Sequence, residues 1–182
     1  MKARLHLEPN LLETAVSEPA GSDFDRLFVA QYGRVVAIAL RILADRSEAE
    51  DVAQEVFIDF HRRYPAQSGF APAWLHTAAA HSALNRIRSR RRRQHRELAA
   101  SAREPRFTPD PGQIVEVAED RARVRRALAR LPRRAATILA LRYSGLSYVE
   151  VGAAIGVGTG SVGTLLRRAE QALRKEMADA TP

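Results

Sequence analysis

The sequence predicts an all-α fold made of two small helical domains joined by an extended linker. Apolar residues recur at helical spacings in most of the chain between residues 23 and 98 and again between residues 119 and 178. Between them lies a segment rich in proline and glycine, with Pro105, Pro109, Pro111 and Gly112. We therefore expect a mobile N-terminal arm over residues 1–22, a first domain over 23–98, a linker over 99–118 and a second domain over 119–178.

Composition and charge limit the classes of function that this chain can have. The formal net charge of +8 and the isoelectric point near 10.8 predict an anionic partner, and nucleic acid is favoured over membrane because the basic residues are clustered. The absence of cysteine excludes disulfides and Cys-ligated zinc. No apolar run has the length of a membrane span and no signal peptide is visible, so the sequence predicts a cytoplasmic protein without membrane insertion.

No catalytic site is predicted. The five histidines are scattered without a metal-ligand pattern, and no glycine-rich phosphate loop follows a strand. No nucleophile, base or metal ligands can be assembled. The sequence therefore predicts a protein that is not an enzyme and that needs no cofactor or metal.

The first domain is expected to contain three helices. The first, over residues 24–43, has apolar residues at helical spacings, and Gly33 in its interior costs about 1 kcal/mol of helix stability. Ser47 and Glu50 form a predicted capping box that begins the second helix. That helix has an apolar stripe suited to a core and, beside it, an acidic ridge of Glu48, Asp51, Glu55 and Asp59.

The acidic ridge has two possible interpretations. It is a candidate docking surface on an otherwise basic protein. Alternatively, it is a solvated face that favours the helix N-terminus, which accounts for Glu48 and Asp51 better than for Glu55 and Asp59, since the dipole effect fades after one turn.

An aromatic loop and an arginine run follow. Two prolines and a glycine between residues 65 and 72 break the helix and present Phe70 in a loop before Trp74. The next helix ends in a dense basic run that contains Arg86, Arg88, Arg90, Arg91, Arg92, Arg93 and Arg96. Rings and guanidinium groups in this order suit single-stranded or distorted nucleic acid. The alternatives are a solvated helix end and, for Trp74, a place in the core.

Residues 146–173 have the pattern of a helix-turn-helix. Ser147 and Glu150 form a capping box, and Val149, Ala153 and Ile155 are expected to form the apolar side of a short helix that Gly156 ends. A second helix begins at Gly158 or Thr159, and its apolar stripe consists of Val162, Leu166, Ala169 and Leu173. Such a helix can enter a DNA major groove, although a plain helical hairpin would show a similar pattern.

Taken in order, these parts resemble the extracytoplasmic-function sigma factors of bacterial RNA polymerase. The resemblance covers roughly residues 24–175. Its most specific pieces are EAEDVAQEVFIDFHRRY, which looks like the polymerase-binding helix of domain two, and LPRRAATILALRYSGLSYVEVGAAIGV with SVGTLLRRAEQALRK, which looks like domain four.

The resemblance implies roles for three surfaces. The ridge would bind the clamp helices of the largest subunit of core RNA polymerase, through Glu48, Asp51, Gln54, Glu55 and Asp59. The aromatic loop and arginine helix would bind the melted downstream promoter element, through Phe70, Trp74, His81, Asn85, Arg86, Arg88, Arg90, Arg91, Arg92 and Arg93. The helix-turn-helix would bind the upstream element, through Thr159, Ser161, Thr164, Arg167, Arg168 and Gln171.

Two further contacts with polymerase are implied. The apolar surface near residues 138–146 would receive the flap of the second-largest subunit, and the linker would thread toward the active site. The chain departs from the family pattern at Ala80, His81 and Asn85, and at Gly163 and Leu165, where long basic side chains are usual. Upstream recognition is therefore expected to be weak or unusual.

Two other functions stay open from the sequence. One is an autonomous helix-turn-helix regulator, which would need a dimer surface that no heptad supplies. The other is a sigma-like polymerase adaptor with reduced promoter recognition. An anti-sigma factor that holds the protein silent would be a further partner of such a sigma factor.

Overall fold

The computed structural model describes residues 22–100 and 114–179, which form seven α-helices and no strand. The first three are α1 (Asp23–Leu43), α2 (Arg46–Arg63) and α3 (Ala71–Ala100). The other four are α4 (Ile114–Arg130), α5 (Arg133–Tyr143), α6 (Tyr148–Ile155) and α7 (Thr159–Ala178). The predicted all-α class is confirmed. Of the arm predicted over residues 1–22, all but Ser22, the N-cap of α1, lies outside the described residues, and so does most of the linker.

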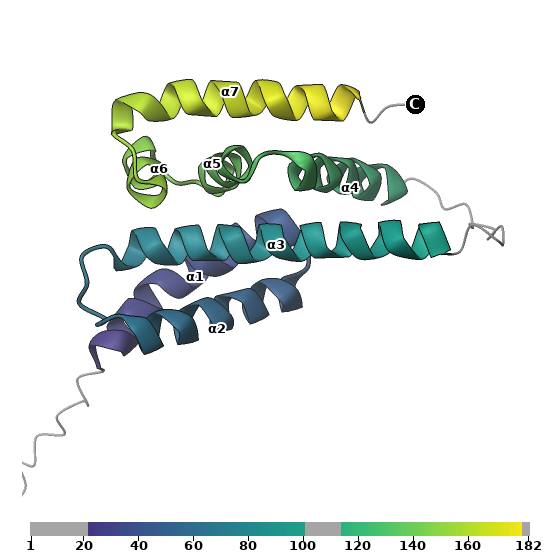
Figure 1. Cartoon of the computed structure of the whole chain (residues 1–182). Helices are drawn as coiled ribbons and strands as arrows, with labels where there is room; N and C mark the ends of the chain where they lie inside the picture. The colour runs from purple at the N-terminus through teal and green to yellow at the C-terminus, as the bar shows by residue number, and fades with distance from the viewer. Residues whose placement is uncertain (1–21, 101–113, 180–182) are drawn as a thin grey trace, which may run out of the picture.

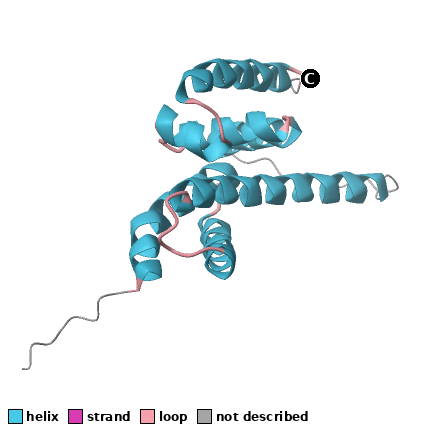
Figure 2. Ribbon diagram, turned by 60° about the vertical axis from the view of Figure 1, so that its left-hand side comes forward, coloured by secondary structure: helices cyan, strands magenta, loops and turns pink. Residues whose placement is uncertain are grey.

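The helices are stacked in layers, with α3 in the middle (Figure 1). On one side α3 packs against α1 and α2, and on the other side it contacts α4, α5 and α6. The layer of α4–α6 lies between α3 and α7, and the turned view in Figure 2 shows the same stacking. The buried apolar side chains of both groups form one continuous core.

Aromatic residues fill the junction of α1 and α2. Phe57 of α2 is buried, and its ring lies 4.8 Å from that of Phe28 and 6.3 Å from those of Phe24 and Tyr32, measured between ring centroids. These distances are typical of favourable aromatic pairs, which add to the apolar area that the rings bury. The junction therefore holds α2 in a defined rotation about its axis, with the apolar stripe inward and the acidic ridge outward.

Several predicted helix boundaries need correction. The capping box at Ser47 and Glu50 was wrong: Asp45 is the N-cap of α2, and its carboxylate accepts a 2.9 Å hydrogen bond from the Glu48 backbone N–H. The linker predicted over residues 99–118 was too long, because α3 continues to Ala100 and α4 begins at Ile114. Within the described ranges no single helix has the length and apolar character of a membrane span; only the bent pair α6 and α7, taken together, meets those two criteria.

Candidate nucleic-acid interface

The helix-turn-helix is formed by α6 and α7, whose axes are bent by 86° relative to each other. The capping box predicted at Ser147 is present, with the Ser147 N–H donating to Glu150 Oε2 at 2.7 Å. Gly156 ends α6 in the left-handed region with φ of 70°, which favours glycine. Gly152 allows the close turn, because a Cβ there would lie 2.8 Å from the Val157 carbonyl oxygen.

The buried side of α6 differs in part from the predicted one: Ile155 packs against the core as expected, but the other two residues of the predicted apolar side do not. Val151 and Gly152 are buried, whereas Val149 is 66% exposed and Ala153 is also exposed. The buried side of α6 faces α7, since a Cβ at Gly152 would lie 3.4 Å from the Val162 side chain. Periodicity within eight residues could not distinguish the two sides of α6. On α7 the prediction holds for Val162, Leu166 and Ala169, which are buried.

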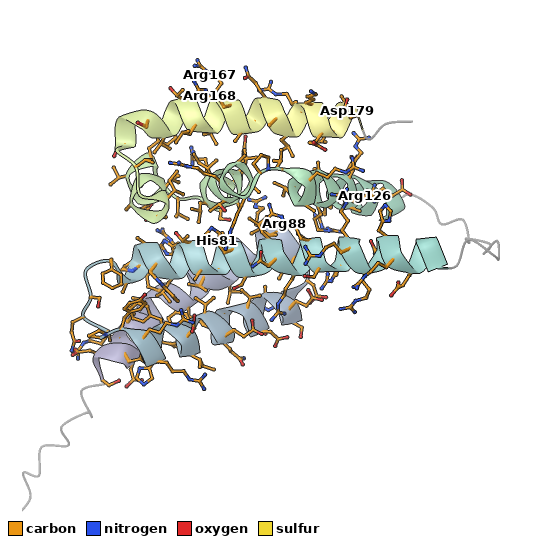
Figure 3. All side chains as sticks on the ribbon, viewed as in Figure 1. His81, Arg88, Arg126, Arg167, Arg168 and Asp179 are labelled. Carbon is orange, nitrogen blue, oxygen red and sulfur yellow. The ribbon has the colours of Figure 1, made fainter. Side chains whose placement is uncertain are left out.

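The residues predicted to read the upstream element are exposed on α7, and all but Thr159 share its outer face. These residues are Thr159, Ser161, Thr164, Arg167, Arg168 and Gln171. The side chains of Arg167 and Arg168 point away from the rest of the molecule (Figure 3). Gly163 and Leu165 lie at the flanks of this face: a Cβ at Gly163 would be 3.6 Å from the Tyr148 ring, and Leu165 packs against the core.

The acidic ridge lies on the outward side of α2. Its residues are exposed or half-buried, and Gln54 lies beside them on the same exposed surface. The ridge is paired with arginines of α3: Arg86 lies 2.6 Å from Glu55 and 4.0 Å from Asp51, and Arg90 forms an ion pair with Glu48. Asp59 pairs with Arg63 of its own helix at 2.7 Å.

The residues predicted for the downstream element are therefore split among different faces of α3. Arg86 and Arg90 face the ridge, while His81 and Arg88 point toward α4 and α5 (Figure 3). Asn85, Arg91, Arg92 and Arg93 are exposed. The sequence grouped all of them because they are close along the chain, but a helix distributes consecutive residues around its axis.

Phe70 and Trp74 lie together at the N-terminal end of α3. Phe70 is 49% exposed, and its ring meets that of Tyr64 edge-on at 5.2 Å. Trp74 is half-buried and packs on Phe60 at 5.4 Å and on Tyr64 at 5.6 Å. Trp74 thus belongs largely to the core, and Phe70 is the more exposed of the two rings.

A basic groove lies between α3 and the end of α4. It has a volume of about 540 Å³ and is lined by Arg88, Arg91, Arg92, His95, Arg96 and Ala129. Burial and the neighbouring charges of Arg133 and Arg92 lower the pKa of Arg88. This excess of positive charge favours an anion such as a nucleic-acid phosphate.

The apolar surface expected near residues 138–146 is not a surface. Ile138, Leu139, Leu141 and Leu146 are buried, because they form the core beneath α6 and α7. The exposed apolar groups nearby are Tyr143, Tyr148 and Val149, at the end of α5 and the start of α6. Arg142 lies over the Tyr148 ring, 5.5 Å from its centroid.

Sequence reasoning assigned no role to His76, which is buried where α1, α3 and α6 meet. Its Nε2 lies 3.0 Å from Gln31 Oε1. Burial and the positive charge of Arg34 lower the pKa of His76 to about 4, opposed by Glu150. His76 is therefore neutral in the folded protein at neutral pH, and no periodicity within α3 would indicate this environment.

Acid should destabilise the protein through His76. The unfolded chain takes up the proton near pH 6.5 while the folded protein takes it up only near pH 4, so stability falls as pH decreases through that window. Between pH 7 and pH 5 we expect a loss of about 2 kcal/mol in the free energy of unfolding. Urea titrations of the wild type and of His76→Gln, which lacks the titrating group, measure this loss, and an equal loss in both proteins would contradict the assignment.

Comparison with known proteins identifies the family. Residues 27–93 match the Sigma-70 region 2 family and residues 121–173 match Sigma-70 region 4. The ECF RNA polymerase sigma factor SigE of Mycolicibacterium smegmatis is 34% identical over 174 residues, which cover 91% of this chain and 67% of SigE. This chain belongs to the ECF sigma factors.

Other ECF sigma factors align over most of their length. SigW of Bacillus subtilis is 26% identical over 164 residues, which cover 80% of this chain and 84% of SigW. The solved structure of CnrH in complex with the cytosolic domain of CnrY superimposes with a TM-score of 0.51 at 17% identity, over 87% of this chain and 89% of that one, and shows the same fold.

As an ECF sigma factor, the protein recognises promoters in transcription initiation and works with core RNA polymerase. The region 2 match contains α2 and most of α3, with the ridge and the downstream residues, and the region 4 match contains the helix-turn-helix. Among the residues that the structure describes, no group of three or more His, Cys, Asp or Glu side chains could hold a metal.

Proposed function

We propose that this ECF sigma factor is a promoter-specificity subunit, without catalytic activity of its own, that acts in the cytoplasm. The observation that carries the proposal is that three surfaces are accessible: the acidic ridge on α2, the exposed Arg91, Arg92 and Arg93 on α3, and the polar, basic outer face of α7. We assign the first two surfaces to a domain over residues 23–100 and the third to a domain over residues 114–178.

Core polymerase is the partner proposed for the ridge. Its carboxylates are outward and accessible, and those of Asp51 and Glu55 keep about 60% of their side-chain surface exposed. A basic helix pair, as in the clamp of the largest subunit, would complement them and speed encounter. Arg86 and Arg90 already pair with the ridge, so binding of a basic partner would release these arginines for DNA phosphates.

The two DNA contacts are proposed to differ in kind. At α3, Phe70 offers a face for one unstacked base, and the exposed Arg91, Arg92 and Arg93 offer charge to the single-stranded backbone. At α7, the exposed outer face suits the major groove of duplex DNA. The exposed Tyr143, Tyr148 and Val149 are proposed to meet the flap in place of the buried residues 138–146.

The decisive experiment is transcription from a library of promoter fragments by core RNA polymerase with and without the purified chain. We expect a defined subset of promoters to be transcribed only when the chain is present. Association with polymerase without any selected promoter would favour the adaptor instead. Specific duplex binding without polymerase would favour the autonomous regulator, for which the sigma-factor relatives give no support.

The exposed arginines should set the salt dependence of DNA binding. Each phosphate contact to a single strand contributes roughly 0.7 to the slope of log affinity against log salt. Replacing Arg91, Arg92 and Arg93 by glutamine should therefore lower the slope by about 2, with little change in sequence preference. Fluorescence anisotropy of holoenzyme on a premelted promoter, at several salt concentrations, measures the slope. An unchanged slope would show that the arginine run is only a solvated helix end.

A further inference from the structure

The arginines of α3 are divided between two sides of the helix. On the side that faces α2, Arg86 and Arg90 form ion pairs with carboxylates of the acidic ridge. Arg88, Arg92 and Arg96 are spaced by four residues, so they lie along another side of α3. Among the side chains that the structure describes, no carboxylate forms an ion pair with these three arginines. The described residues therefore neutralise one arginine side of α3 and leave the other with its full charge.

This second side of α3 forms one wall of the basic groove. Arg91 and His95 complete the lining from α3, and Ala129 contributes from the end of α4. The groove volume of about 540 Å³ lies within the roughly 300 to 1,000 Å³ that is typical of small-molecule sites. The residues from Arg88 to Arg96 extend over about 12 Å along the helix axis. Their side chains can therefore contact several groups of one elongated ligand.

Arg88 is half-buried in the groove, whereas the other basic side chains of the groove are exposed. Its Nη2 donates to the Leu131 carbonyl at 2.9 Å, just after α4, and its Nε lies 3.4 Å from the Ala129 carbonyl. A guanidinium group has five N–H donors, so Arg88 is held in place and still has donors for a ligand. Burial and the charges of Arg133 and Arg92 lower the pKa of Arg88, and a bound anion would relieve this repulsion.

We propose that the basic groove is a binding site for a small multivalent phosphate anion, a polyphosphate chain that is either free or carried by a nucleoside. A guanidinium group can donate two parallel hydrogen bonds to phosphate oxygens, and a row of such groups matches a chain of phosphates better than a single anion. The site shares Arg91 and Arg92 with the surface proposed for single-stranded DNA. It differs from that surface because it includes Arg96 and omits Arg93.

Isothermal titration calorimetry of the full chain with sodium tripolyphosphate, at about 0.15 M salt and without metal ions, measures the site directly. We expect saturable binding of one tripolyphosphate per chain, at least about tenfold tighter than the binding of sulfate. ATP in place of tripolyphosphate separates the two sources of the phosphate chain. Tighter binding of ATP assigns the site to nucleoside polyphosphates, and equal or weaker binding assigns it to inorganic polyphosphate. Lack of saturable binding by both, or equal affinity for sulfate, would overturn the proposal.

Matched substitutions on α3 separate the groove from the overall charge of the helix. Arg92→Gln should weaken tripolyphosphate binding roughly tenfold, because the hydrogen bonds of one groove arginine to a charged ligand are lost. Arg92→Lys keeps the charge without the planar fork, so its affinity should lie between those of the wild type and Arg92→Gln. Arg93→Gln removes an equal charge from an exposed neighbour that does not line the groove, and screening should limit its effect to about twofold. Equal losses from Arg92→Gln and Arg93→Gln would mean that the anion follows net charge, and the site would be refuted.

The ring of His95 reports where the anion binds. His95 lines the groove, whereas His61 lies on α2 beside two other basic residues, Arg62 and Arg63. In NMR spectra of the full chain, tripolyphosphate should shift the His95 ring signal with the midpoint that calorimetry gives and leave the His61 signal in place. His95→Gln and His61→Gln assign the two signals. Saturable binding that leaves the His95 signal unchanged would place the anion elsewhere on the protein and overturn the proposal.

Discussion

Core RNA polymerase should no longer co-purify with the Asp51→Arg, Glu55→Arg double variant. Truncating one partner of a close charge pair at an interface costs about 2 to 5 kcal/mol, so reversing two ridge charges against a basic clamp should weaken binding at least roughly a hundredfold. The two carboxylates lie one turn apart in the centre of the ridge, on the outward side of α2. Pull-down and titration with core polymerase measure the effect.

The fold should survive this change. Both carboxylates are about 60% exposed, and their shared partner is Arg86 at 2.6 and 4.0 Å. Exposed ion pairs contribute about 0.2 to 1 kcal/mol each, so the melting temperature should decrease by only a few degrees. Glu50→Lys is the control, because Glu50 lies on a different side of α2 and pairs with Arg46 at 2.8 Å. Retained polymerase binding in a folded double variant would rule out the ridge as the contact.

The second large effect is expected at the outer face of α7. Arg167→Ala and Arg168→Ala should each weaken recognition of the upstream element, because a good bidentate base contact contributes about 1 to 3 kcal/mol of discrimination. That range corresponds to roughly tenfold to hundredfold in binding. Lys175→Ala removes an equal charge near the C-terminal end of α7, where a recognition helix does not reach base edges, and it should have little effect.

The structure also changes what we expect of substitutions at Gly163 and Leu165, where α7 departs from the family pattern. Gly163 lies at the flank of the reading face with space for a side chain, so Gly163→Lys should add a phosphate contact and steepen the salt dependence. Leu165 packs against the core, so an arginine there would remove apolar packing. Upstream-element binding by holoenzyme, compared among the wild type, these variants and Lys175→Ala, tests the assignment. Equal affinity for the wild type, Arg167→Ala and Arg168→Ala would mean that other groups of α7 read the DNA.

Short-range patterns in the sequence were sufficient to predict the helix-turn-helix. Ser147 and Glu150 cap α6, Gly156 ends it, and Val162 with Leu166 faces the core, as the sequence predicts. Each of these features depends on residues within one or two turns of one another, and so their spacing along the chain contains the information. The ridge was visible for the same reason, since a single helix places Asp51 and Glu55 on one side.

Where two neighbouring residues could fill the same structural role, prediction from the sequence was less reliable. Asp45 and Ser47 are both good N-cap residues, and the structure uses Asp45. Val149 and Val151 both fit the apolar side of α6, and the structure buries Val151. In each pair the outcome depends on how the neighbouring helices approach, which short-range patterns do not specify.

The sequence by itself determined the all-α class, the helix-turn-helix and the cap of α6, because these follow from periodicity and local hydrogen bonding. Only the tertiary structure decided that Arg86 faces the acidic ridge, that Arg88 caps the end of α4 and that His76 is neutral beneath Arg34 and Glu150. These contacts join residues distant along the chain, since α3 packs between two groups of helices and each side of it meets a different one. Three-dimensional packing, and not the order of residues along α3, gives its arginines different neighbours.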